Sequence, residues 1–179
     1  MKLQLLFVLF YPLTLFSQDI EILDEYLVVP DEYPTIQSAI NASEDGETVF
    51  VKNNTYYLET TNTANNGGID TPCSTTITQY GGIYFNGKNI SLIGESKEGV
   101  ILDGYGLWDE HIIYFNDYND GSPTSNALLQ NFTLKNTDFV LCGRSAVAFS
   151  GSSGIINNII IEDNISAGDG PAIFINNES

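Results

Sequence analysis

Basic side chains are the scarcest class in this chain, whose 179 residues hold 6 Lys and Arg against 23 Asp and Glu, a net charge of −17. So acidic a surface repels nucleic acid and anionic lipid headgroups, and we expect neither as a partner. It also repels uronate-rich polysaccharides unless a bound cation such as Ca²⁺ bridges the two. The simplest interpretation is an acidic exterior that keeps the protein soluble.

Cysteine and histidine are nearly absent too, with two Cys and one His in the whole chain. These are too few for a zinc site of the usual spacing. Cys73 and Cys142 either pair as a single disulfide or remain separate thiols, and the sequence leaves both open. His111 has no nucleophile signature nearby and is interpreted as a structural histidine.

The one long apolar run lies at the N-terminus and is too short to cross a bilayer. It follows the positive Lys2, and Ser17 offers a small residue for cleavage. This order predicts a secretory signal peptide over residues 1–17, and hence a secreted or cell-surface protein without a membrane span. We expect residues 18–26 to form a flexible acidic lead and residues 27–179 to form one domain.

Two series of short apolar segments recur along that domain at intervals of roughly 30 residues, a spacing typical of solenoids. Each segment alternates apolar and other side chains, which predicts half-buried strands. Three segments begin with Asn89, Asn131 and Asn158. The second series consists of residues 83–85, 113–115, 147–149 and 173–175.

The two ends of the domain differ. Residues 34–41 place Ile36, Ala39 and Ile40 at helical spacing, which predicts a short helix capping the first turn, before a strand at residues 48–51. No cap follows residues 173–175, so we expect further turns or a partner at the C-terminal end. Between the ends, residues 53–82 are interpreted as a long excursion from the strands, and residues 104–108 and 116–126 as loops.

The asparagines that open the first series have a mechanical interpretation. Asn89, Asn131 and Asn158 are candidates for a ladder in which each amide donates to the one stacked beneath it. The alternative is that Asn simply tolerates tight turns.

Several stretches resemble the opening of pectin-lyase-like right-handed parallel β-helix proteins, and pectin methylesterases begin in much this way. They are residues 29–40, 45–49, 87–94 and 100–104, and residues 157–175 are similar to repeats of secreted bacterial β-helix proteins. The resemblance implies an all-β, right-handed parallel β-helix. It leaves the activity open, because many activities share this opening.

The catalytic motifs of these families are incomplete here. Polygalacturonases carry Asn-Thr-Asp followed by paired aspartates; residues 136–138 match the first, but Gly170 follows Asp169 where a second carboxylate is needed. Asp138 and Asp169 are therefore weak catalytic candidates, interpreted instead as turn residues. Related lyases use a Lys or Arg base, and the only arginine, Arg144, is interpreted as a salt-bridge residue.

Aromatic and acidic side chains gather around two of the expected loops. Tyr105, Trp108 and Tyr118 suit stacking against sugars, and we take them as candidate substrate-binding residues. Asp117 and Asp120 are candidates for a Ca²⁺ site, although Tyr118 breaks the regular calcium-loop spacing.

The sequence thus favours a secreted β-helix domain that contacts carbohydrate, with no active site identified in this segment. Two alternatives stay open. One is the N-terminal part of a pectinesterase-like or lyase-like enzyme whose catalytic turns lie beyond Ser179, and the other is a structural stalk or adhesin.

Overall fold

The computed structural model describes residues 26–59, 61–62, 77–79, 81–107, 110–116, 126–139, 145–166, 170 and 172–176. These residues form one helix and many short strands, most of which pair in parallel. The elements are β1 (Tyr26–Val29), α1 (Ile36–Ala42), β2 (Thr48–Val51), β3 (Asn54–Glu59), β4 (Thr61–Asn62), β5 (Ile77–Gln79), β6 (Ile83–Tyr84), β7 (Ser91–Gly94), β8 (Val100–Gly106), β9 (Ile113–Asn116), β10 (Leu128–Lys135), β11 (Asp138–Phe139), β12 (Val147–Ser150), β13 (Ile155–Glu162), β14 (Ile165–Ser166) and β15 (Ile173–Asn176).

One parallel sheet has the order β15-β12-β9-β6 and confirms the second series of predicted strands. Ile113 pairs with Val147, and Val147 in turn pairs with Ile173. Equivalent residues of successive segments therefore lie side by side, as the repeat predicted.

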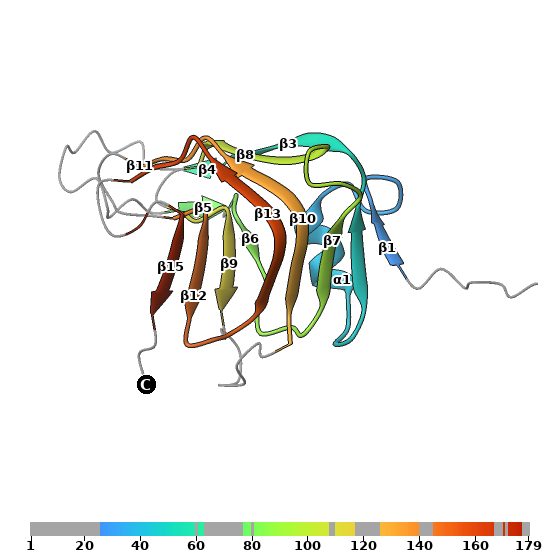
Figure 1. The fold of residues 1–179 in the computed structure, drawn as a ribbon. Coiled ribbons are helices and arrows are strands. Elements are labelled where there is room, and N and C mark those ends of the chain that lie inside the picture. The colour runs from blue at the N-terminus through green and yellow to red at the C-terminus, as the bar shows by residue number, and fades with distance from the viewer. Residues whose placement is uncertain are drawn as a thin grey trace, which may run out of the picture.

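A larger parallel sheet bends over two faces of the molecule (Figure 1). The first half of β10 pairs with β7 and its second half pairs with β8. β13 follows β10 along its whole length. Each of these long strands therefore contributes to two neighbouring faces.

Apolar side chains between the sheets form a single core. The rings of Phe85, Phe115 and Phe149 stack in a column, with centroid distances of 4.3 and 4.5 Å. Leu92 and Leu129 are paired on the facing sheet and are fully buried. Burying one such side chain stabilises the fold by about 1.5–3 kcal/mol. The strand register that aligns these apolar side chains in buried rows is therefore the favoured one.

The predicted helix is confirmed, and it covers the start of the sheets. Thr35 caps it by accepting from the Ser38 amide, while Ile36, Ala39 and Ile40 are buried against β1, β2 and β6. At the other end of the helix, the Lys88 ammonium donates to the carbonyl oxygens of residues 40, 41 and 43 at 2.7–2.8 Å. A cation in this position satisfies carbonyls that the helix leaves unpaired.

The asparagine ladder is confirmed for two of its three members. Asn158 donates through Nδ2 to Oδ1 of Asn131 at 2.7 Å, and Asn131 donates to the carbonyl of Gly94 at 3.1 Å. Asn131 and Asn158 have left-handed φ values of 64° and 53°, and each lies at the bend of a long strand. Asn89 was wrongly included, because it precedes β7 and accepts instead from the Asn126 amide.

Two predicted loops are strands in the structure. Asn54–Glu59, inside the expected excursion, forms β3 and pairs with β8. β8 itself continues through Tyr105 to Gly106, where a loop was expected to begin at Gly104. β1 begins at Tyr26, one residue before the expected start of the domain, and the rest of the expected lead lies outside the described residues.

Among the described residues, no helix is long and apolar enough to cross a membrane.

Candidate functional site

Two tyrosines on neighbouring strands are the most exposed large apolar side chains in the described part of the chain. Tyr57 on β3 is 73% exposed and Tyr105 on β8 is 78% exposed. Tyr57 pairs with Asp103, and Tyr105 follows two positions later on β8. Because side chains alternate along a strand, residues two apart share a face, so both rings lie on the outer side of this sheet.

An irregularity between β3 and β8 shapes this part of the surface. Tyr57 pairs with Asp103 but Glu59 pairs with Gly106, so β8 has one extra residue between the two pairs. Such bulges bend a strand and redirect side chains. Leu58 points inward and is buried, whereas Tyr57 and Glu59 on either side of it are exposed.

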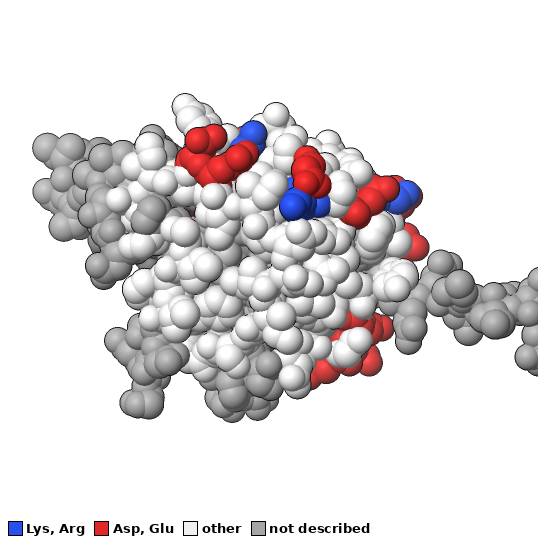
Figure 2. Space-filling model, in the orientation of Figure 1, with Lys and Arg blue, Asp and Glu red and all other residues white. Residues whose placement is uncertain are grey.

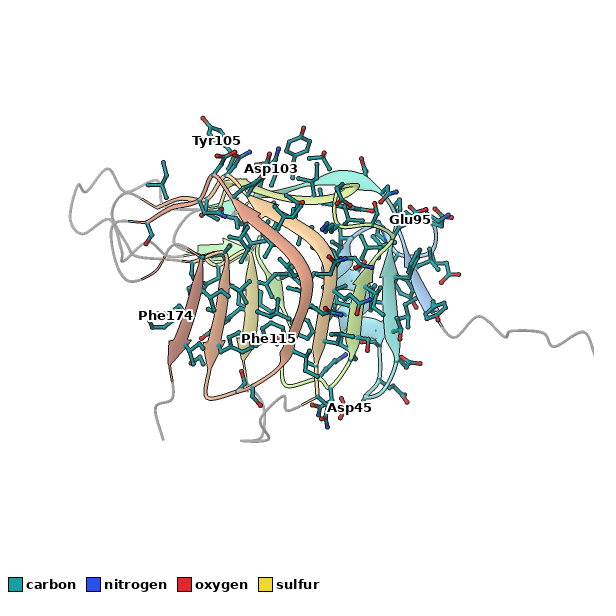
Figure 3. The ribbon with its side chains drawn as sticks, in the orientation of Figure 1. Asp45, Glu95, Asp103, Tyr105, Phe115 and Phe174 are labelled. Carbon is teal, nitrogen blue, oxygen red and sulfur yellow. The ribbon has the colours of Figure 1, made fainter. Side chains whose placement is uncertain are left out.

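Asp103 fixes the backbone from which Tyr105 projects. Its Oδ1 accepts from the Tyr105 amide at 3.1 Å and its Oδ2 accepts from Nδ2 of Asn136 at 2.8 Å. The side chain is buried, and Asn136 has a left-handed φ of 62°. Figure 3 shows Tyr105 extending outward beside Asp103 at one end of the molecule.

The same outer row continues across two more strands. Lys135 on β10 pairs with Asp103, and Glu162 on β13 pairs with Lys135. We call these six residues the tyrosine face: Tyr57, Glu59, Asp103, Tyr105, Lys135 and Glu162. In Figure 2, charged side chains gather along the top of the molecule, where β3 and β8 run in Figure 1, and the sheet surface below them is almost free of charge.

Tyr57 was missed at the sequence level, because residues 53–82 were interpreted as an excursion. A signal was present in the alternation of residues 54–59, where Tyr56 and Leu58 point inward and Thr55, Tyr57 and Glu59 point outward. So short an alternation is a weak strand signal on its own. The pairing with β8 is what holds residues 54–59 as a strand of this sheet.

Of the predicted sugar-binding residues, the structure places Tyr105 on an exposed strand. Asp138 begins β11 and pairs with Ile165, so it is a strand residue and not a turn residue. The remaining site predictions lie outside the described residues: Trp108, Tyr118, Asp117, Asp120, Asp169, Arg144, Cys73 and Cys142. Within the described ranges, no three His, Cys, Asp or Glu side chains gather in a way that could hold a metal.

The buried polar residues beside β6 and β9 have structural partners. The Glu110 carboxylate accepts from the amides of Gly81 and Gly82 and from the Tyr84 hydroxyl at 2.8–3.3 Å. Nδ1 of His111 accepts from the Ser145 amide at 3.0 Å. The interpretation of His111 as structural agrees with this contact.

Two ionisable groups near β3 have shifted pKa values. Burial raises the pKa of the Tyr56 hydroxyl, with the carboxylates of Asp31 and Glu95 adding to the effect. A hydrogen bond to Asp31 raises the pKa of Lys52. The Tyr56 hydroxyl donates to the Lys52 carbonyl, and neither residue belongs to the tyrosine face.

No protein-family model, curated protein or solved structure matches this chain. Fold and site together define a strand-rich protein of parallel sheets that presents exposed tyrosines from rigid strands.

Proposed function

We propose that this chain is a secreted or cell-surface domain, built as a right-handed parallel β-helix, that contacts carbohydrate through the tyrosine face. The observation that carries the proposal is the exposure of Tyr57 and Tyr105 side by side on paired strands. Exposed apolar groups that lie next to each other and form a patch commonly mark binding surfaces.

The β-helix part of the proposal is supported by how the strands recur. β6, β9, β12 and β15 pair in sequence order, and β7, β10 and β13 do the same on the neighbouring face. A helix covers one end of the stack, and the Asn131–Asn158 ladder joins two successive turns. The resemblance of residues 29–40 and 87–94 to pectin-lyase-like proteins points the same way.

Tyrosine rings suit sugars because one flat apolar surface packs against the C–H side of a pyranose while the hydroxyl remains in water. Covering about 100 Å² of ring surface contributes roughly 2.5 kcal/mol at about 25 cal/mol/Å². The rings of Tyr57 and Tyr105 project from paired strands and not from a loop, so little conformational entropy is lost when a ligand binds.

The test is binding of the secreted chain to a panel of insoluble and soluble polysaccharides, followed by calorimetry on any that it retains. We expect Tyr57→Ala and Tyr105→Ala each to weaken binding by about 70-fold, the equivalent of the roughly 2.5 kcal/mol given above for the covered ring area. Tyr26→Ala is the matched control, because Tyr26 is also exposed but lies on β1, which borders neither β3 nor β8. Equal loss in all three variants would contradict the proposal.

The other two hypotheses predict different results in the same assays. A lyase-like enzyme with catalytic turns beyond Ser179 would release new reducing ends and unsaturated sugars from its polysaccharide. A pectinesterase-like enzyme would instead release methanol from esterified pectin. A stalk or adhesin would bind none of the glycans, and Tyr57→Ala would behave like the unaltered chain.

A further inference from the structure

We propose that the tyrosine face selects glycans that carry free amino groups, a class represented by deacetylated glucosamine polymers, over neutral and uronate glycans. This inference rests on the proposed carbohydrate-binding function. It adds the charge class of the ligand, which the two tyrosines alone do not specify.

The charges on the tyrosine face favour a cation. The exposed carboxylates of Glu59 and Glu162 share the outer row with one ammonium, that of Lys135. The Asp103 carboxylate in the same row is buried and accepts from the Tyr105 amide and from Asn136. Lys135 pairs with Asp103 on one side and Glu162 on the other, so two negative neighbours offset its charge. A uronate approaching this row meets more negative than positive charge.

The other lysines in the described ranges form contacts away from the tyrosine face. Lys52 forms an ion pair with Asp31, and Lys97 lies 3.6 Å from a carboxylate oxygen of Glu98. Lys88 donates to the carbonyls at the end of α1. None of the three supplies a free cation that would attract a uronate to the face.

The two tyrosines themselves attract cations as well as sugar rings. An ammonium group over the face of an exposed tyrosine is held by the negative side of the ring, and a nearby carboxylate strengthens that attraction. Glu59 provides this carboxylate, because it is exposed and pairs with Gly106, the residue next to Tyr105. The net charge of −17 adds long-range attraction for a polycation.

The placement of the rings on two strands favours an oligomer as the ligand. Tyr57 lies on β3 and Tyr105 on β8, and both are exposed, so they offer two separate contact points on one surface. An oligomer can reach both rings with different sugar units of one chain. We therefore expect a single glucosamine to bind far more weakly than its oligomers.

The experiment compares three oligosaccharides of equal length by calorimetry with the intact secreted chain: a glucosamine oligomer, its fully N-acetylated form and an oligogalacturonate. We expect the free-amine oligomer to bind about tenfold more tightly than the acetylated one, from ammonium–ring and ammonium–carboxylate contacts. Raising salt from about 0.1 M to about 1 M shortens the Debye length from about 10 Å to about 3 Å, so this preference should largely disappear.

Two matched variants separate local recognition from general charge. Glu59→Gln should reduce the preference for the free amine while leaving binding of the acetylated oligomer unchanged. Glu44→Gln removes the same charge beside Asp45, at the opposite end of the molecule (Figure 3), and should change neither. Equal effects of the two substitutions would overturn the inference, because the attraction would then be that of the net charge alone.

The remaining outcomes distinguish this inference from the function on which it rests. If the acetylated oligomer or the oligogalacturonate binds as tightly as the free amine, and Tyr105→Ala weakens that binding, the carbohydrate function holds and the amine preference is wrong. If no oligosaccharide binds, both proposals fail.

Discussion

At the residue scale, Asn131 shows how a side chain and a backbone conformation depend on each other. Its left-handed φ of 64° bends β10 from one face to the next, and its amide joins Gly94 and Asn158 on the neighbouring strands. Asn adopts this conformation more readily than other residues with a Cβ. The sequence pointed to Asn131 and Asn158 through their spacing. Asn89 shows the same pattern but does not lie at the bend of a strand, because it precedes β7.

We expect Asn131→Ala to destabilise the fold by about 2–3 kcal/mol, because it removes two hydrogen bonds and places a Cβ residue without compensation in the left-handed region. Asn131→Gly should cost less, since glycine keeps the bend and loses only the hydrogen bonds. Urea unfolding followed by circular dichroism measures both. The control is Asn157→Ala, which removes one exposed contact to Gln130; an equal cost there would show that the bend is not under strain.

Tyr56 makes the stability sensitive to alkaline pH. Burial raises the pKa of its hydroxyl, which donates to the Lys52 carbonyl at 2.8 Å. The folded state therefore keeps its proton at a pH where the unfolded chain has lost it, and stability falls as the pH rises above about 10, the ordinary tyrosine value.

Comparing urea unfolding at neutral pH and above about pH 10 measures this loss, and the Tyr56→Phe variant should show less of it than the unaltered chain. Tyr57→Phe, at the exposed neighbouring position, should leave the pH dependence as it is. A pH dependence that is the same in the Tyr56 variant would contradict the assignment.

At the element scale, strands with a strong pattern and a buried partner were predictable, and those with mixed faces were not. Thr48–Val51 and Ile113–Asn116 alternate clearly and were predicted nearly to the residue. Asn54–Glu59 contains the strand formers Thr and Tyr, but it begins a stretch rich in Thr, Asn and Gly that was interpreted as an excursion. Its strand conformation depends on pairing with β8, a contact between residues about 46 apart that no local window contains.

The docking of α1 gives a prediction at the same scale. Lys88 ties the end of the helix to the turn before β7 through three carbonyl oxygens, from Ile40, Asn41 and Ser43. Lys88→Met keeps most of the side-chain length and removes the donors, so we expect a loss of about 1–2 kcal/mol in the free energy of unfolding. Lys97→Met removes only an exposed ion pair with Glu98 and should cost less than about 1 kcal/mol. A cost for Lys88→Met no larger than for Lys97→Met would contradict this role.

At the scale of the whole molecule, the architecture was more predictable from the sequence than the site. The recurrence of residues 83–85, 113–115, 147–149 and 173–175 predicted the order of one sheet, because similar apolar segments pair in register and form one row. The tyrosine face joins β3, β8, β10 and β13, which are distant in sequence and share no motif. Its members become neighbours only through strand register.

The β15 end of its sheet differs from the interior at equivalent positions. Ile113 and Val147 are fully buried, whereas Ile173, in the same row of the sheet, is 44% exposed, and Ile175 nearby is 64% exposed. Among the described residues, Ile113 and Val147 have a paired strand on both sides, whereas Ile173 has one on a single side. A strand paired on the free edge of β15 would give Ile173 the same surroundings.

Substituting the two isoleucines measures whether that end is covered. In the isolated 179-residue chain, Ile113→Ala should cost about 2–5 kcal/mol, as for other fully buried isoleucines, because it leaves a cavity in the core. Ile173→Ala removes the same atoms from a surface that water already reaches, so its cost should be less than half as large. Urea unfolding gives both values, and repeating it over a range of protein concentrations shows whether self-association contributes. Equal costs for the two variants would contradict an open end and would mean that Ile173 is covered in solution as completely as Ile113.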